Sequence, residues 1–429
     1  MTHIALQSRV KKLRHIPTII SPAWALALWV GVLGLPAMAA EASLKQLFEA
    51  ALVKHPSVLQ ARSQAQAAGF DLEAAQWGRF PTLSSEVRSD TGYAQSLAKV
   101  EQPVWTGGKL SSRIALAESN QRTAQAGIQE AQYNALTQVA TAFYEALRLE
   151  QRHKSAALNV VEHERLLNLI QRRAQAEISP PADTTLAQAR LQQAVSERIQ
   201  IKKQLDVSLS TLAQWAGPLL GPLKAPTDIP MARTTDGQLL ERVVTHSSQR
   251  QRLLSQIDSA DAQINVSKSQ MYPSVMAGFQ RTWAGQVTPG TDRSSAYLSL
   301  QFQSGAGLSA RSGIQAAASR KDAAQQELET LERNLLSQAQ AALSELDALA
   351  AQIEPAKALL EGTTEVVESY VRQYQVGRKN WLDVLNAQRE KTQALYNQAD
   401  TQYGHQLAKV RLMIMTGDIS AQQLLVLND

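Results

Sequence analysis

The chain has 429 residues, of which 44% are hydrophobic, only 5% are aromatic and none is cysteine. The lack of cysteine excludes disulfides, thiolate catalysis, cysteine zinc sites and lipid attachment through an N-terminal thiol. The net charge of +5 falls to about +1 without the four basic residues of positions 1–39, so the basic isoelectric point gives no reason to expect nucleic-acid binding. Alanine, glutamine, leucine and serine dominate, which favours long helices packed through small residues.

Residues 1–39 have the features of a secretory signal peptide. Basic residues precede an apolar run, about Ala23–Leu35, and the sequence Ala37–Ala39 fits a cleavage site. We expect cleavage after Ala39. A membrane anchor is the alternative, but the run is shorter than the roughly 20 residues that span a bilayer. No later stretch is long and apolar enough to predict a membrane-spanning helix.

The two halves of the chain have similar sequences at an offset of about 200 residues. The matched pairs are Gln175 with Gln375, Asp183 with Asp383, Leu212 with Leu412, and Gly217 with Gly417. Such self-similarity predicts a duplicated structural unit. We therefore divide the mature chain into a first repeat (40–217), a linker with proline and glycine (218–236) and a second repeat (237–429).

Each repeat is predicted to contain the same elements in the same order. An alanine-rich helix, about 43–77 or 237–271, precedes two strands at about 82–104 or 274–304. A helical hairpin follows, at about 109–216 or 308–416, in which a very long helix turns back into a shorter one. From Leu328 to Leu360, leucine and alanine recur every three or four residues, which predicts a coiled-coil seam. A helix of about 65 residues is roughly 100 Å long, so two shorter helices would lie end to end beside it.

The predicted strands have one apolar face and one largely polar face. Leu298 and Leu300 alternate with Tyr297, Ser299 and Gln301, a pattern that suits a wall between lipid and water. A small soluble sheet is the alternative. Four strands cannot close a barrel, so several copies would have to share one, with eight strands from two copies or twelve from three.

The sequence gives no constellation for catalysis. The segment Gly305–Ala310 fits a dinucleotide fingerprint, but a very long helix follows it where a βαβ unit is required. His153 and His163 are expected at the surface of one helix and not as metal ligands. We therefore expect no catalytic residue, no metal site and no cofactor, so the protein is not expected to be an enzyme.

Four motifs together resemble the TolC family of outer-membrane channel proteins. They are HPSVLQARSQAQAA, VEQPVWTGGKL, MYPSV and YQVGRKNWLDVLNAQRE, and the resemblance covers nearly all of residues 40–429. It implies a mainly α fold with a β-barrel part, in which a homotrimer builds a 12-stranded outer-membrane barrel that continues into a periplasmic α-helical tunnel. It also implies a passive channel in outer-membrane lipid that works with a periplasmic adaptor protein and an inner-membrane transporter.

The resemblance also implies where the adaptor docks. The glycine of the family's hairpin tip matches Gly377, next to Val376. The equivalent position in the first repeat is Glu177, so that tip is expected to turn at Pro180–Pro181 instead.

A periplasmic gate is implied at the same end. Asp383 matches the first of two aspartates that form charged rings, and Asn386 stands at the second. Tyr374, Lys379 and Asp183 match a tyrosine, a basic residue and an aspartate that latch the gate. Two simpler roles for Asp383 remain open, an interaction with the helix dipole and a surface pair with Lys379.

The form GRKNWLDVLNAQRE is most similar to channels that secrete large adhesins or repeat toxins, so we expect type I protein secretion driven by an ABC transporter. The alternative within the family is efflux of drugs or metals through a proton-driven pump. An alternative of another class is a periplasmic coiled-coil scaffold without a pore, which would leave the paired strands without a purpose.

Overall fold

The computed structural model describes residues 41–90, 93–219, 221–226, 229, 235–284, 293–302 and 309–421. The predicted signal peptide, positions 220, 227–228 and 230–234 of the predicted linker, and most of the Gly305–Ala310 segment lie outside these residues. The elements in chain order are α1 (Leu44–Lys54), α2 (Pro56–Trp77), β1 (Thr82–Asp90), β2 (Tyr93–Trp105), α3 (Lys109–Gln175), α4 (Pro181–Ala216), α5 (Asp236–His246), α6 (Ser248–Ser269), β3 (Ser274–Ala284), β4 (Arg293–Gln301), α7 (Ser309–Gln375) and α8 (Trp381–Met415).

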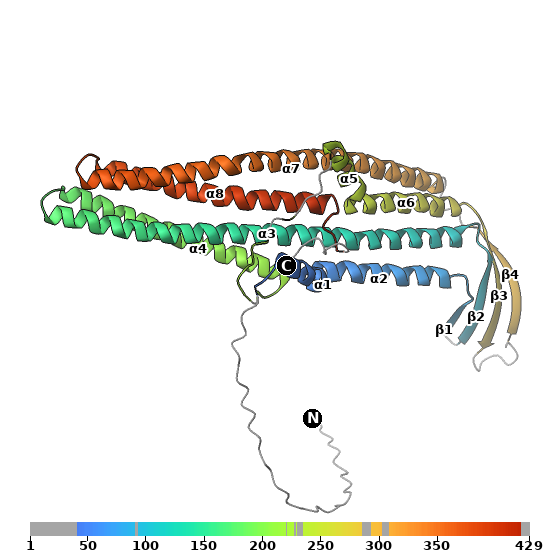
Figure 1. Ribbon diagram of the computed structural model, residues 1–429. Helices are drawn as coiled ribbons and strands as arrows, with labels where there is room; N and C mark the ends of the chain where they lie inside the picture. The colour runs from blue at the N-terminus through green and yellow to red at the C-terminus, as the bar shows by residue number, and fades with distance from the viewer. Residues whose placement is uncertain are drawn as a thin grey trace, which may run out of the picture. The chain divides into compact units, whose positions relative to one another are not determined.

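Two very long helices organise the unit from Ala40 onward. Helices α3 and α7 have 67 residues each, which corresponds to about 100 Å. Helices α2 and α4 pack along α3, helices α6 and α8 pack along α7, and α3 also contacts α6 and α8 (Figure 1). The predicted fold of long antiparallel helices with two strand pairs is confirmed.

The helix that precedes each strand pair is broken, whereas the sequence predicted one continuous helix. The first break falls at His55, which has extended backbone angles (φ −67°, ψ 131°), because Pro56 disfavours helical geometry in the residue before it. The second break falls at Ser247 (φ −61°, ψ 116°) without a proline. Its hydroxyl accepts a hydrogen bond from the backbone N–H of Arg250 at 3.2 Å and so caps α6.

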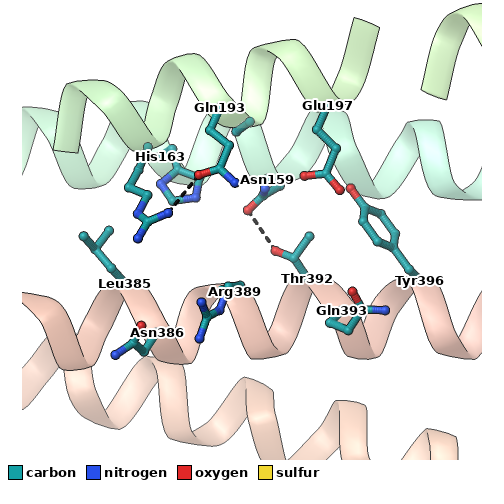
Figure 2. A pocket seen from close by; sticks show the side chains of 12 residues that line it. Asn159, His163, Gln193, Glu197, Leu385, Asn386, Arg389, Thr392, Gln393 and Tyr396 are labelled. Carbon is teal, nitrogen blue, oxygen red and sulfur yellow. Dashed lines mark hydrogen bonds between the residues drawn. The ribbon is translucent and has the colours of Figure 1, made fainter. Parts of the chain in front are cut away.

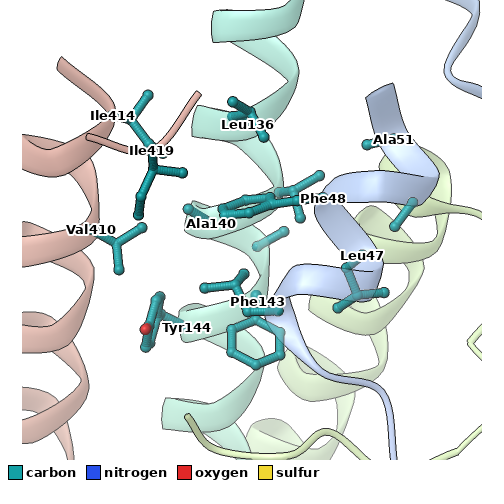
Figure 3. Close-up of a cluster of buried hydrophobic side chains, with 14 of the residues drawn as sticks. Leu47, Phe48, Ala51, Leu136, Ala140, Phe143, Tyr144, Val410, Ile414 and Ile419 are labelled. Atoms are coloured by element: carbon teal, nitrogen blue, oxygen red, sulfur yellow. The ribbon is translucent and has the colours of Figure 1, made fainter. Parts of the chain in front are cut away.

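The largest buried hydrophobic cluster joins the two repeats at mid-length. Phe48 of α1, Phe143 and Tyr144 of α3, and Val410 and Ile414 of α8 lie within it (Figure 3). Phe48 and Phe143 have no exposed surface, and burying an aromatic side chain of this size contributes about 1.5–3 kcal/mol. This cluster fixes α8 against α3 far from the hairpin tips.

The four strands form one antiparallel sheet in the order β1-β2-β3-β4. The pairing places Leu83 opposite Val100, Val100 opposite Phe279, and Ala277 opposite Leu298. Because neighbours across a sheet share a face, these apolar side chains cover one face. Phe279 and Leu298 are 51% and 71% exposed in the single chain.

The opposite face of the sheet is polar. Glu101 accepts a hydrogen bond from the Tyr297 hydroxyl at 2.9 Å and lies 2.6 Å from the Lys99 ammonium. The ring of Tyr297 lies on Gly278, where an added Cβ would be 2.3 Å from the ring carbon Cζ. The sheet thus has the two-sided character that the strand pattern predicted.

The predicted seam of α7 is only partly covered within one chain. Leu335, Ala339 and Leu346 are buried, but Ile353 is 37% exposed and Leu359, beside the predicted seam, is 50% exposed. Helix α7 therefore retains apolar side chains that no other helix in the described part of the chain fully covers.

Candidate functional site at the hairpin tips

The two hairpin tips have the same backbone conformation. Glu177 and Gly377 adopt left-handed angles, with φ of 56° and 76°. After each, a backbone N–H bonds back to the preceding helix, from Ile178 to the Arg173 carbonyl at 2.9 Å and from Arg378 to the Gln373 carbonyl at 2.8 Å. This pattern closes a helix C-terminus and satisfies its last carbonyls.

The prediction that the first tip turns at Pro180–Pro181 is therefore wrong. Pro180 is the N-cap of α4 and Pro181 occupies its first turn, a position that proline favours because no N–H is needed there. The chain turns at Glu177, which accepts a left-handed geometry that usually requires glycine. Two closing hydrogen bonds, Glu177 N–H to Ala174 at 3.0 Å and Ile178 N–H to Arg173, hold it there.

The outermost side chains of the tips are apolar. Ile178 of the first tip is 64% exposed and Val376 of the second is 70% exposed. Exposed apolar side chains at a rigid turn are suited to contact another protein. Val376 was predicted from the resemblance, whereas Ile178 was missed because its counterpart at the repeat offset is Arg378.

Tyr374 joins the two tips to each other. It is 5% exposed, its ring lies 5.4 Å from that of Trp381, and its hydroxyl hydrogen-bonds with the Ser179 hydroxyl at 3.1 Å. The Arg173 guanidinium lies 4.7 Å over the Tyr374 ring and donates to the Gln375 carbonyl at 3.1 Å. Arg173 and Ser179 were not predicted, since their role depends on partners about 200 residues away.

An apolar cluster supports the tips from behind. This tip cluster brings together buried side chains of all four hairpin helices: Leu166, Ile170, Ala187, Val367, Val371, Tyr374, Trp381, Val384, Leu385 and Ala387. Tyr374, for which a gate role was predicted, is part of this cluster and is fixed by packing as well as by hydrogen bonding.

Asp383 lies in the first turn of α8. Its Oδ2 accepts the N–H of Asn380 at 3.4 Å and lies 3.8 Å from the Lys379 ammonium. The Lys379 ammonium also lies 4.3 Å over the Tyr370 ring. In one chain, Asp383 thus acts as a helix-terminal carboxylate with a lysine partner, and its side chain remains 41% exposed. Asp183 occupies the corresponding position in the first turn of α4.

Asn386 lies one turn beyond Asp383 in α8 and lines a polar cavity of about 90 Å³ between α3, α4 and α8 (Figure 2). In the same region, the side-chain oxygen Oδ1 of the buried Asn159 accepts hydrogen bonds from the Gln388 amide at 3.1 Å and the Thr392 hydroxyl at 2.9 Å. This polar layer fixes the register of α8 against α3, because an unpaired buried amide would be costly.

His163 also lines this cavity and is 8% exposed, so the prediction that it lies at the surface is wrong. Position 163 is one turn from Asn159 and Leu166 and falls on the face of α3 that α4 and α8 cover. Burial, and next the charge of Arg190, lower the pKa of His163.

None of the helices in the described part of the chain combines the length and hydropathy that a bilayer crossing requires. Long paired hairpins joined to a sheet with one apolar and one polar face define the architecture of an outer-membrane channel subunit. The chain belongs to the outer membrane efflux protein family, whose model matches residues 47–218 and 247–418. This confirms the resemblance to TolC-type channels, and the family is one of channels and not of enzymes.

Two curated relatives are metal resistance proteins. The chain is 28% identical over 371 residues to the nickel-cobalt-cadmium resistance protein NccC of Alcaligenes xylosoxydans xylosoxydans, covering 80% of this chain and 78% of that protein. It is 26% identical over 323 residues to the cobalt-zinc-cadmium resistance protein CzcC of Cupriavidus metallidurans, covering 73% and 74%.

A solved structure shares the fold. The crystal structure of a membrane protein from Pseudomonas aeruginosa matches with a TM-score of 0.76 and 20% identity, over 87% of this chain and 93% of that one. As a member of the family, the protein lies in the outer membrane and extends into the periplasm.

Proposed function

We propose that the protein is the outer-membrane exit duct of an efflux system for divalent metal cations. The observation that carries this proposal is the similarity along most of the chain to two metal resistance proteins. These relatives favour the efflux alternative over type I secretion of an adhesin or toxin. The duct is passive, and an inner-membrane pump driven by protons supplies the energy.

The duct is a homotrimer. One chain contributes four strands, and three copies would supply the twelve strands of a closed sheet wide enough for a pore. The exposed apolar side chains Ile353 and Leu359 of α7 support this assembly. On α4, Ile199 and Val207 are 60% and 59% exposed and offer a second apolar surface for a neighbouring copy.

The periplasmic end is the gate. Three copies of Asp383 around one axis would form a cation-favouring constriction, and Asn386 makes this ring less acidic than one built from two aspartates per chain. Tyr374 and Lys379 close the gate from the second hairpin. Asp183 faces it from the first hairpin of the same or the next copy.

The tips receive the periplasmic adaptor protein. Val376 and Gly377 of the second tip, and Glu177 with Pro180 and Pro181 of the first, supply its docking surface. Since the two tips share one backbone conformation, both repeats can present similar surfaces to the adaptor.

Metal retention in cells tests this function. Deletion of the gene should raise cell-associated nickel, cobalt, zinc or cadmium, and wild-type protein should restore export. Gly377→Pro should fail to restore it, because proline cannot adopt a φ of 76°. Gly362→Ala is the matched control, since no atom lies within 4 Å of the added Cβ. Unchanged retention of all four metals after deletion would reject the proposal.

A further inference from the structure

An ion pair lies on the polar face of the sheet, at the end of the strands that adjoins the helices. The Lys99 ammonium is 2.6 Å from the Glu101 carboxylate, and their side chains are 28% and 18% exposed. The register places Glu101 opposite Thr82, the first residue of β1, and opposite Gly278 of β3. Because Lys99 and Glu101 are two residues apart on one strand, both lie on this face.

Tyr297 of β4 holds the two charges together. Its hydroxyl donates to the Glu101 carboxylate at 2.9 Å. The centroid of its ring lies 5.7 Å from the Lys99 ammonium, within the range of a cation–π contact. Gly278 leaves the space that the ring needs, since an added Cβ would lie 2.3 Å from the ring carbon Cζ. Lys99 and Glu101 are therefore fixed side by side.

A second ion pair on the same face has much less cover. Arg88 lies 3.1 Å from Glu86 on β1, and their side chains are 76% and 59% exposed. Water and salt screen such an open pair, and its side chains stay mobile. The partly covered pair of Lys99 and Glu101 keeps its geometry, so its two charges cancel each other at a fixed place on the sheet.

The polar face becomes the wall of the pore when several copies share one closed sheet, because the apolar face then meets lipid. Symmetry places one Glu101 carboxylate from each copy at the same height. Fixed charges on a pore wall decide which sign of ion is enriched beside it. A ring of Glu101 carboxylates alone would attract cations, whereas a Lys99 ammonium beside each carboxylate cancels most of that field.

We propose that Lys99 is a selectivity-determining residue of the duct, which neutralises the Glu101 ring so that this part of the pore wall does not retain cations. The inference rests on the proposed function, because it takes the polar face as the pore wall and metal cations as the cargo. The proposed Asp383 ring concentrates cations at the periplasmic entrance. A second acidic ring beyond it would hold the same cations inside the duct, and conduction requires that they leave.

Reversal potentials in planar lipid bilayers under a KCl gradient test this assignment. At about 10 mM salt the Debye length is about 30 Å, so charges on the wall act across the pore. Lys99→Met should raise the ratio of cation to anion permeability about twofold or more. Glu101→Gln should lower this ratio, and the double variant Lys99→Met/Glu101→Gln should restore the wild-type value. Lys99→Arg keeps the charge and should also keep the wild-type value.

Arg281→Gln is the matched control. The register places Arg281 opposite Ala98, on the apolar face, and its guanidinium lies 5.3 Å over the Trp283 ring. The variant removes one positive charge from the same sheet and should leave the permeability ratio unchanged. In about 1 M salt, where the Debye length is about 3 Å, the differences between all these variants should disappear.

The outcomes separate this inference from the proposed function. A wild-type permeability ratio in both Lys99→Met and Glu101→Gln, or an equal shift in Arg281→Gln, would overturn the selectivity role of Lys99 and leave the metal cargo untouched. Unchanged metal retention after gene deletion would reject the metal cargo, whereas opposite shifts in Lys99→Met and Glu101→Gln would still support the control of ion selectivity by Lys99.

Discussion

Arg173 connects the two hairpin tips, and Arg173→Gln should loosen one tip from the other. Its guanidinium lies over the Tyr374 ring and donates to the Gln375 carbonyl. A half-exposed cation–π contact contributes about 0.5–1 kcal/mol, and a hydrogen bond from a charged donor contributes about 1.5–3 kcal/mol when buried and less when exposed. The combined loss is therefore about 1–3 kcal/mol, or roughly 5- to 150-fold in the opening equilibrium.

Amide hydrogen exchange measures this opening directly. The N–H groups of Ile178 and Arg378 close the two tips, so their exchange in Arg173→Gln should accelerate by the same factor. Arg172→Gln is the matched control, since the Arg172 guanidinium donates to Asn168 of its own helix at 3.2 Å. Equal exchange in Arg173→Gln and wild type, or equal acceleration by Arg172→Gln, would refute the reasoning.

Four further predictions concern other parts of the molecule. Asp383→Ala should weaken channel block by multivalent cations in single-channel recordings, and unchanged block would remove Asp383 from the gate. Because burial lowers the pKa of His163 below its ordinary 6.5, the unfolded chain binds more protons than the folded chain, so stability should fall as pH drops from about 7 to 5. His163→Gln should flatten this pH dependence of stability in urea unfolding. An equally steep pH profile in the variant would contradict the prediction. Gly278→Ala should destabilise the sheet by about 1–3 kcal/mol through overlap with Tyr297, and Tyr297→Ala in the same chain should recover most of that loss in thermal unfolding. Glu177→Gly should stabilise the first tip by about 1 kcal/mol by removing a left-handed strain, and a lower unfolding midpoint would argue against it.

Helix lengths and strand faces could be predicted because they depend on local periodicity. The first long helix, predicted to start near position 109 with about 65 residues, has 67 residues and ends at Gln175. The alternation around Leu298 matches a face of the sheet. The helix break at Ser247 could not be predicted, since no proline or glycine marks it and a serine N-cap also occurs within loops.

The candidate site was predictable only where a residue has a counterpart in the family motif. Tyr374, Lys379 and Asp383 were predicted to lie at the site from their match to the motif. Glu177 was identified as the equivalent of Gly377, but its left-handed conformation was not predicted, because propensity favours glycine there and the closing hydrogen bonds override it. The role of Arg173 and the burial of His163 depend on contacts between helices that are distant in sequence. The spacing of residues along one helix cannot predict such contacts.

Electrical recording in planar lipid bilayers tests the central claim, that this protein is a channel, most directly. The purified protein should insert and produce discrete current steps of one unit size. If Asp383 and Tyr374 hold the tips closed, the wild-type protein should have a lower conductance than Arg173→Gln. Purified protein that associates with lipid but carries no current in either form would contradict the account.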